Sequence, residues 1–373
     1  METEGNEMKK ILFATTALIA TASMAAAEVR ISGYGRFGLD YNDGNSNNVN
    51  DANYNGVSET NITSRLRLQF DMSAETDSGV AFDARFRAQA ESRDNNPNGA
   101  SFNGARFGVV YNGLRVNVGN IIGAVENMPG LYLETRTAGI GIDGAGFVSV
   151  VTNVNDEAFN WDAYSSGGSG ANGIEALYSA NGFVGHISYS ADNDTVGTAG
   201  TPAVTGVDSG GDTYIITPAV AATPNVIGGD RFGIMLSYNF GDWTVAAAHQ
   251  ASDAMWEDKT AVSVSGNLGQ FGVRVAYADN DGIGKWGLYG NVDIGSNSNL
   301  LAFVTDEDAV DQADVNMGRT DNRDVNNGGL GTEGTSYGIH YSYDLGGGAS
   351  FEAGYRRASN DNDTLQAGVY FSF

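Results

Sequence analysis

Apolar and polar residues alternate one by one along stretch after stretch of the chain. Residues 62–72 place isoleucine, leucines, phenylalanine and methionine mostly on one face, and threonine, arginines, glutamine and aspartate on the other. Residues 79–89 and 364–373 repeat the pattern. A period of two predicts β-strands with one apolar and one polar face. We therefore expect an all-β protein.

Composition agrees with this prediction and excludes several kinds of site. The chain of 373 residues contains 52 Gly, only 5 Pro, 17 Phe and 17 Tyr, which suits strands joined by turns better than helices. It has no cysteine, which excludes disulfides and thiolate metal sites. A formal net charge of −25 argues against a nucleic-acid partner, because phosphates would be repelled.

The alternating stretches predict sixteen strands. They lie near residues 28–41, 60–74, 79–92, 101–111, 114–120, 171–180, 183–191, 230–240, 242–251, 259–268, 270–279, 285–295, 298–305, 335–345, 349–358 and 363–373.

The links between these strands are alternately short and long. Short links include Asn112-Gly113 and Asn181-Gly182, the dipeptides with the strongest hairpin signal. The other links, among them 42–59, 121–170, 192–229 and 280–284, are read as longer and polar. Outer-membrane barrels have an even number of antiparallel strands, with short turns on one rim and long loops on the other. Closure also pairs every strand edge, which lipid requires. We therefore predict a 16-stranded antiparallel transmembrane β-barrel in the outer membrane.

The N-terminal segment has the features of an export signal. Lys9 and Lys10 precede an apolar run over residues 11–22, and three alanines follow before Glu28. This order predicts a signal peptide over residues 1–27. Within it, residues 1–7 read as an upstream start or an added extension, and residues 28–373 form the barrel domain.

Arginines are concentrated on the polar phase of the first three strands. These are Arg36, Arg65, Arg67, Arg85 and Arg87. Like charges on neighbouring strands repel each other, so such a cluster is tolerable where the face is wet and acidic groups lie opposite. The alternative is the solvated outer face of a soluble sandwich. With the predicted export signal and sixteen strands, a basic wall lining a channel explains the cluster better.

The long link over residues 121–170 supplies acidic partners for this wall. It contains Glu126, Glu134 and Asp143 together with apolar residues that argue against simple disorder. We expect this third loop to fold into the lumen and to face the arginines. Opposed carboxylates and guanidinium groups would then create a transverse field that sorts solutes by size and charge.

Several segments together resemble the general diffusion porins of Gram-negative outer membranes, the alphaproteobacterial branch most of all. They are "EVRISGYGRFGLDY", "SRLRLQFDMSAETDSGVAFDARFRAQ", "LRVNVGNIIGAVENMPGLYL", "YSYDLGGGASFEAGY" and "LQAGVYFSF". The resemblance implies a homotrimer in which each third loop constricts a pore against basic wall residues. It implies that Phe373 is presented to the barrel-assembly machinery, and that outer-membrane lipid and lipopolysaccharide surround the barrel.

Cofactor chemistry is not expected. Some relatives bind calcium among loop acids, and the Asp- and Asn-rich loops at 42–51 and 305–324 offer candidate ligands. Their spacing matches no calcium-binding loop.

The predicted function is a water-filled channel for passive diffusion of ions and small hydrophilic solutes. Two alternatives stay open: a substrate-selective channel, and a structural or adhesive barrel with a plugged lumen. An enzyme is not expected, because His186, His249 and His340 lie on separate predicted strands and no nucleophile motif is present.

One motif needs a separate explanation. "GYGRFG" at 33–38 matches the glycine pattern of a dinucleotide-binding turn, but it lacks the preceding strand and following helix. We expect its glycines to let the first strand coil and pack closely where the barrel closes.

Overall fold

The computed structural model describes residues 28–51, 54–92, 97–133, 149–152, 160–168, 170–191, 197, 199–201, 204–207, 210, 213–217, 228–323 and 333–373. Strands dominate these residues: β1 (Glu28–Asn42), β2 (Thr60–Glu75), β3 (Ala81–Glu91), β4 (Ser101–Phe102), β5 (Arg106–Tyr111), β6 (Leu114–Asn120), β7 (Asn172–Ala180), β8 (Phe183–Ala191), β9 (Val204–Val207), β10 (Thr213–Thr217), β11 (Asp230–Phe240), β12 (Trp243–Ser252), β13 (Lys259–Leu268), β14 (Phe271–Asn280), β15 (Ile283–Ile294), β16 (Ser298–Glu307), β17 (Gly334–Gly346), β18 (Ala349–Arg357) and β19 (Asp363–Ser372). A short helix, α2 (Gln312–Asn316), follows β16.

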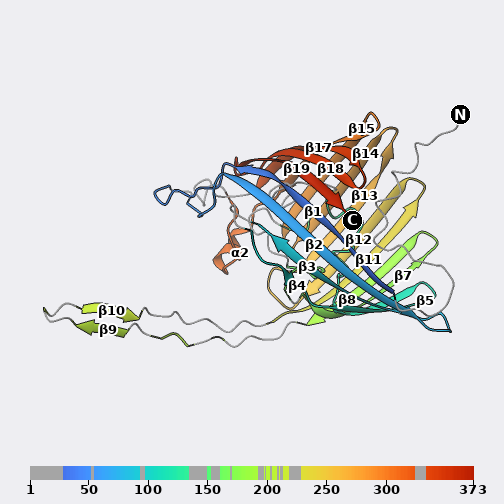
Figure 1. Cartoon of the computed structure of the whole chain (residues 1–373), viewed down its shortest axis with the longest axis horizontal. Coiled ribbons are helices and arrows are strands. Elements are labelled where there is room, and N and C mark those ends of the chain that lie inside the picture. The colour runs from blue at the N-terminus through green and yellow to red at the C-terminus, as the bar shows by residue number, and fades with distance from the viewer. Residues whose placement is uncertain are drawn as a thin grey trace.

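The strands form one closed antiparallel sheet (Figure 1). β1 pairs with β2 along one edge and with β19 along the other, which closes the barrel. β4 and β5 both pair with β3, so together they occupy a single position between β3 and β6. The seventeen strands of this sheet therefore fill sixteen positions. The predicted 16-stranded barrel is confirmed.

With one exception, the short turns lie on the rim opposite the long connections, at the right and left of Figure 1 respectively. At both Asn-Gly turns the two central residues have positive φ: 47° and 80° at Asn112-Gly113, and 51° and 85° at Asn181-Gly182. This conformation matches the twist of the flanking strands.

One predicted long link is wrong. Residues 280–284 are not a loop: Asp281 and Gly282, with φ of 55° and 88°, form a two-residue turn between β14 and β15. Asp-Gly favours this turn for the same steric reason as Asn-Gly. The alternation of short and long links is therefore not strict.

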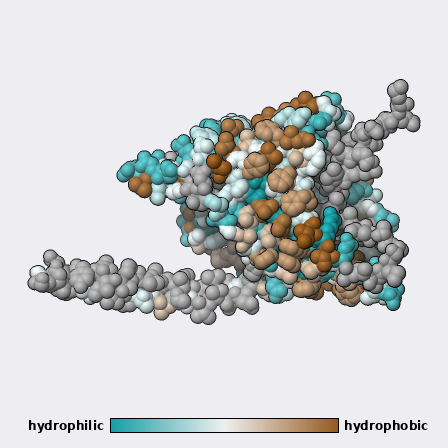
Figure 2. Space-filling view, viewed as in Figure 1, coloured by the Kyte–Doolittle hydropathy of each residue, from teal (hydrophilic) through white to brown (hydrophobic). Residues whose placement is uncertain are grey.

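The outer and inner faces of the barrel reverse the usual pattern of a soluble protein. On β11, Phe232 and Leu236 are 50% and 61% exposed, whereas Met235 and Ser237 are almost fully buried. Figure 2 shows brown and tan apolar residues spread over the barrel wall between more hydrophilic ends. An apolar band of this kind faces lipid in outer-membrane barrels.

The connection between β8 and β11 contains an element that the sequence did not predict. β9 and β10 pair as a separate antiparallel hairpin, which lies away from the barrel in Figure 1. Among the described residues, no helix has the length and apolar character needed to cross a membrane.

Glycines of the 33–38 motif lie where the barrel closes. The backbone of Gly33 exchanges two hydrogen bonds with Phe373, at 2.9 and 3.0 Å. A Cβ atom at Gly35 would lie 2.4 Å from the ring of Phe371, so the ring occupies the space that a side chain would need. The glycines therefore allow close packing at the closure, as predicted.

Candidate functional site

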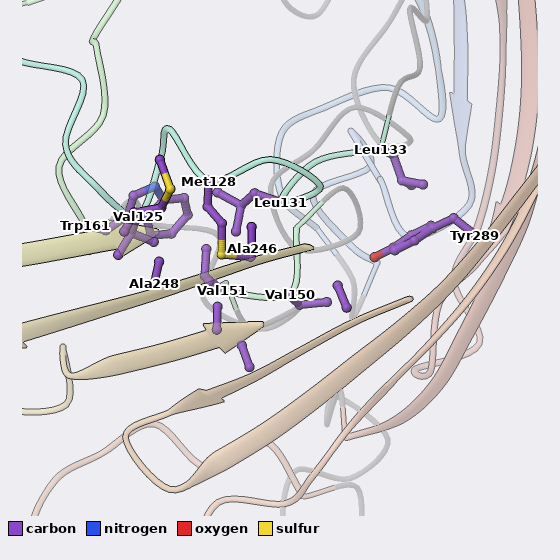
Figure 3. Packing of buried hydrophobic residues seen from close by; sticks show 14 of the residues in the cluster. Val125, Met128, Leu131, Leu133, Val150, Val151, Trp161, Ala246, Ala248 and Tyr289 are labelled. Atoms are coloured by element: carbon purple, nitrogen blue, oxygen red, sulfur yellow. The ribbon is translucent and has the colours of Figure 1, made fainter. Parts of the chain in front are cut away.

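The largest buried apolar cluster lies inside the barrel, where the connection between β6 and β7 packs against the wall. We call residues 121–171 the inner loop; residues 134–148, 153–159 and 169 of it lie outside the described residues. Val125, Met128, Leu131 and Trp161 of this loop are at most 3% exposed. Figure 3 shows these side chains directed toward the barrel strands, close to Ala246 and Ala248 of β12.

Alanines on the inner face of three neighbouring strands make room for the inner loop. They are Ala246 and Ala248 on β12, Ala261 on β13, and Ala276 and Ala278 on β14, and all are buried in the same cluster. Larger side chains at these positions would occupy the volume that the loop fills. We call the inner faces of β12–β15 the loop-bearing arc.

Polar side chains of the same arc hold the loop by its backbone. Ser263 donates to the carbonyl of Pro129 at 2.6 Å, Asn280 to Val150 at 2.9 Å, Lys285 to Thr152 at 2.7 Å and Gln250 to Asn160 at 3.0 Å. Arg274 donates to the carbonyl of Tyr132. Each bond satisfies a loop carbonyl that the barrel interior would otherwise leave without a partner.

The first residues of the inner loop are held by a buried carboxylate on β7. Glu175 accepts hydrogen bonds from the backbone amides of Ile122 and Gly123, at 3.1 and 2.9 Å, and from Asn117 at 2.6 Å. His186 of β8 lies 3.2 Å from the same carboxylate. Both side chains are fully enclosed. The cluster fixes the point at which the chain leaves the wall and enters the lumen.

The arginines lie on the other side of the barrel. Arg36, Arg65, Arg67, Arg85 and Arg87 project from β1, β2 and β3 as predicted, and Arg106 of β5 and Arg115 of β6 extend the group. We call these seven residues the arginine arc. Arg106 and Arg115 could have been found from the sequence, because both fall on the polar phase of predicted strands.

Four arginines of the arc have carboxylate partners. Arg65 is bonded to Glu91, Arg85 lies 2.5 Å from Asp71, and Arg115 lies 2.7 Å from Asp83. Arg36 lies 3.9 Å from Glu91.

Three other arginines contact amides and tyrosine rings instead. Arg67 donates to Gln89 at 2.8 Å and lies 5.0 Å from the centre of the Tyr34 ring. Arg87 donates to Gln69 and to Ser166 of the inner loop, both at 3.0 Å, and lies 4.6 Å from the Tyr164 ring. Arg106 lies 5.5 Å from the same ring. The arc thus combines neutralised and un-neutralised guanidinium groups.

A barrel closed by sixteen strand positions, with an inner loop against one wall and arginines on the other, is the architecture of a channel. The family model for Gram-negative porins matches residues 14–363. The chain belongs to this family. It forms an outer-membrane channel for passive diffusion, which confirms the predicted function and location.

Individual porins agree with this assignment. A porin from Fuscovulum blasticum is 29% identical over 274 residues, which cover 70% of this chain and 88% of that protein. A solved triple mutant of the Rhodopseudomonas blastica porin has a TM-score of 0.64 at 24% identity, covering 93% of this chain and all of that one. A variant of the same porin with two substitutions has a TM-score of 0.63 at 26% identity.

Of the three predicted loop acids of this porin, the structure describes Glu126. Glu126 is half-buried, and one of its oxygens, Oε2, accepts hydrogen bonds from Tyr132 at 2.6 Å and from Trp161 at 2.8 Å. Desolvation within the loop raises the pKa of Glu126 to about 7, although both hydrogen bonds and the charge of Arg87 act in the opposite direction. Glu134 and Asp143 lie outside the described residues.

The histidines have structural positions. His186 contacts Glu175, His340 of β17 lies 3.2 Å from the buried Glu352, and His249 bonds to Thr260 on the exposed face. Within the described part of the chain, no three histidine or acidic side chains are placed to hold a metal ion. Calcium binding by the 42–51 and 305–324 loops stays a prediction.

Proposed function

We propose that the channel is constricted between the arginine arc and the inner loop. The observation that supports this most directly is the position of the loop. Its apolar residues are buried against the loop-bearing arc, while Tyr164 and Ser166 of the same loop contact Arg87. The loop therefore crosses the lumen and narrows it to the space beside the arginines.

Opposite charges flank that space. Arg87 acts electrostatically on Glu126, whose second oxygen, Oε1, accepts no hydrogen bond from the described residues. We propose Glu126 as one acid of the constriction, with Glu134 and Asp143 as further acids. Carboxylates on one side and guanidinium groups on the other order water and select small hydrophilic solutes and ions. Passive diffusion through such a constriction needs no cofactor and no catalytic group.

Single-channel conductance of the purified protein in planar bilayers tests the proposal. We expect stepwise openings, and we expect Arg87→Gln to increase the preference for cations, measured as the reversal potential in a KCl gradient. Arg357→Gln is the matched control, because Arg357 is paired with Asp361 and Asp363 at the loop rim. Equal shifts in both variants would contradict a constriction at the arginine arc. The absence of any openings would favour a plugged structural barrel.

Family membership also supports proposals about assembly. We propose a homotrimer surrounded by outer-membrane lipid and lipopolysaccharide, with Phe373 as the signal to the barrel-assembly machinery and residues 1–27 as the export signal. Different migration of the unboiled and the boiled protein on denaturing gels would support the folded barrel, with slower migration of the unboiled protein if the trimer survives detergent. Cross-linking to three copies tests the trimer.

A further inference from the structure

We propose that Arg67 and Arg87 form a binding subsite for the oxyanion groups, carboxylate or phosphate, of small solutes. This rests on the proposed constriction, within which it assigns different roles to different arginines. The arginines paired with carboxylates shape the wall, whereas Arg67 and Arg87 remain available to a passing anion.

The contacts of the two residues carry this distinction. Arg67 and Arg87 each donate through Nε to a neutral glutamine, Gln89 and Gln69 respectively. Neither has a carboxylate partner among the described residues. An amide oxygen fixes the guanidinium plane but leaves its charge intact, whereas a carboxylate would neutralise it.

The two glutamines also separate the arginines from the nearest acids. Gln69 donates through Nε2 to Asp71 at 2.7 Å, and Gln89 donates through Nε2 to Glu91 at 3.4 Å. Because the amide nitrogen of each faces an acid, its oxygen faces an arginine. Each glutamine therefore stands between a guanidinium group and a carboxylate that would otherwise pair with it.

Tyrosine rings fix the same two guanidinium groups. Tyr34 lies beside Arg67 and is stacked on Tyr370 at 5.2 Å between ring centres. Tyr164 lies beside Arg87 and donates to the backbone carbonyl of Arg85 at 3.2 Å. Cation–π contacts hold a guanidinium group in place without cancelling its charge. The subsite is thus preorganised.

A third positive charge, that of Arg106, lies next to the subsite. Arg106 contacts the Tyr164 ring, is 9% exposed, and has no ion pair among the described residues. Its Nε is a buried donor without a hydrogen-bond acceptor. A buried positive charge that the protein leaves unpaired raises the electrostatic potential at Tyr164 and Arg87. A bound anion would lower that cost.

Arg67 and Arg87 lie on the inner face of the barrel without being fully enclosed. Both residues are half-buried, and neither contributes to the buried donors that lack a partner. The strand register places Arg67 opposite Gln89 and Arg87 opposite Gln69, so the two arginines are diagonal neighbours on β2 and β3. Planar guanidinium forks at this spacing suit an oxyanion with two or more oxygens.

Block of the KCl current by inorganic phosphate and by succinate tests the subsite in the full-length protein. We compare Arg67→Gln, Arg87→Gln and Arg67→Lys with the charge control Arg357→Gln. For the three subsite variants we expect the half-blocking concentration of both anions to rise by about threefold to tenfold, the range expected when one charge-assisted contact is lost. Arg67→Lys keeps the charge but loses the fork, so its reversal potential in a KCl gradient should stay close to that of the native protein.

Three results would overturn the subsite. The first is a native channel whose current neither anion blocks, and the second is Gln variants that change no more than Arg357→Gln. The third is Arg67→Lys with unchanged block, which would show that a diffuse field is sufficient. In each case the channel would still conduct and Arg87→Gln would still shift the reversal potential, whereas failure of the proposed constriction would appear as equal reversal-potential shifts in Arg87→Gln and Arg357→Gln. Gel mobility of unboiled samples confirms that every variant is folded.

Discussion

The inner wall of this porin has two arcs. Side chains alternate between the inner and outer faces in both, but the residues that point inward differ in kind and in role. On the arginine arc, long charged side chains line the inner face, and five of the seven arginines are partly exposed. On the loop-bearing arc, alanines such as Ala261 and Ala278 line a face that is buried under the inner loop. Barrel closure depends on backbone pairing and on the apolar exterior, so it leaves the inward side chains free to specialise.

The hydrogen bonds of the two arcs differ in the same sense. On the arginine arc they join side chains to one another, as between Arg67 and Gln89. On the loop-bearing arc they join wall side chains to loop carbonyls, as between Asn280 and Val150. The first arrangement orients charges and the second positions a segment of backbone. We therefore expect substitutions on the loop-bearing arc to change pore shape, and substitutions on the arginine arc to change selectivity.

The largest effect is expected from Glu175→Ala, which removes the carboxylate at the start of the inner loop. The amides of Ile122 and Gly123 would lose their acceptor inside the barrel, at a cost of about 3 kcal/mol or more. We expect the loop to detach at this end, giving larger and noisier single-channel currents.

Glu352→Ala is a matched control for this variant. Glu352 is also a buried carboxylate 3.2 Å from a histidine, but its hydrogen bonds go to Ser342 and Ser350 on the barrel wall. It should affect barrel stability without changing current noise. Equal noise in both variants would show that Glu175 has no special role in holding the loop.

A second prediction tests the alanines themselves. Ala278→Leu adds volume behind the inner loop, where Ala278 is fully buried, and overpacking of this kind costs about 1–3 kcal/mol. We expect an altered conductance as the loop shifts toward the arginine arc. Val275→Leu on the outer face of β14, where Val275 is 52% exposed, should leave conductance unchanged. If the Ala278 variant conducts like the native protein, the alanines do not set the loop position.

The sequence was sufficient to predict the barrel because alternation and turn residues are local signals. The same rule places five of the seven residues of the arginine arc on the polar face of the first three strands, without Arg106 and Arg115. The hold on the inner loop did not, since Glu175 and His186 lie on adjacent strands and become neighbours only through strand register, which a single sequence does not reveal. The partners of Glu126 were missed for a related reason: Trp161 is 35 residues away along the loop.

Two other differences have physical causes. Alternation of link lengths predicts a loop at residues 280–284, whereas the local Asp281-Gly282 dipeptide favours the two-residue turn that the structure has. The alanines on the polar phase of β12–β14 are consistent with strands. Only the position of the inner loop shows that these small side chains leave the space in which the loop packs. Glu134 and Asp143 stay predictions.

A third prediction concerns the effect of pH on Glu126 of the inner loop, which lies near Arg87 of the arginine arc. The pKa of Glu126 is about 7, so its carboxylate is ionised at pH 8 and mostly protonated at pH 6. Lowering the pH removes a negative charge close to Arg87, and we expect the channel to become less selective for cations. The reversal potential in a KCl gradient at pH 8 and pH 6 measures this change. Glu126→Gln should show little difference between the two values.

Protonation of Glu126 is also expected to change the stability of the inner loop. Because the pKa of Glu126 is raised above its ordinary value of 4.5, the folded loop binds the proton more tightly than the unfolded chain does. Its ionised form therefore destabilises the loop fully above pH 7. Stability should rise as the pH falls from 7 toward 4.5, so current noise at pH 6 should be lower than at pH 8. Tyr132, whose pKa is raised well above 10 by burial and by Glu126, stays protonated throughout. Noise that increases on acidification in the native protein but not in Glu126→Gln would contradict this sign.

The smallest effect is expected for the ion pair between Arg115 and Asp83 on the arginine arc. Its side chains are 27% and 20% exposed, and pairs in contact with water contribute less than about 1 kcal/mol. A double-mutant cycle with Arg115→Gln and Asp83→Asn, read as the temperature at which the folded form disappears on a gel, should give a coupling near zero. Each single variant should nevertheless shift the reversal potential, in opposite directions, because each removes one lumen charge. A large coupling in stability would mean that the arginine arc also helps to hold the barrel together. A small coupling would mean that the charges of the arginine arc act on passing solutes and contribute little to stability.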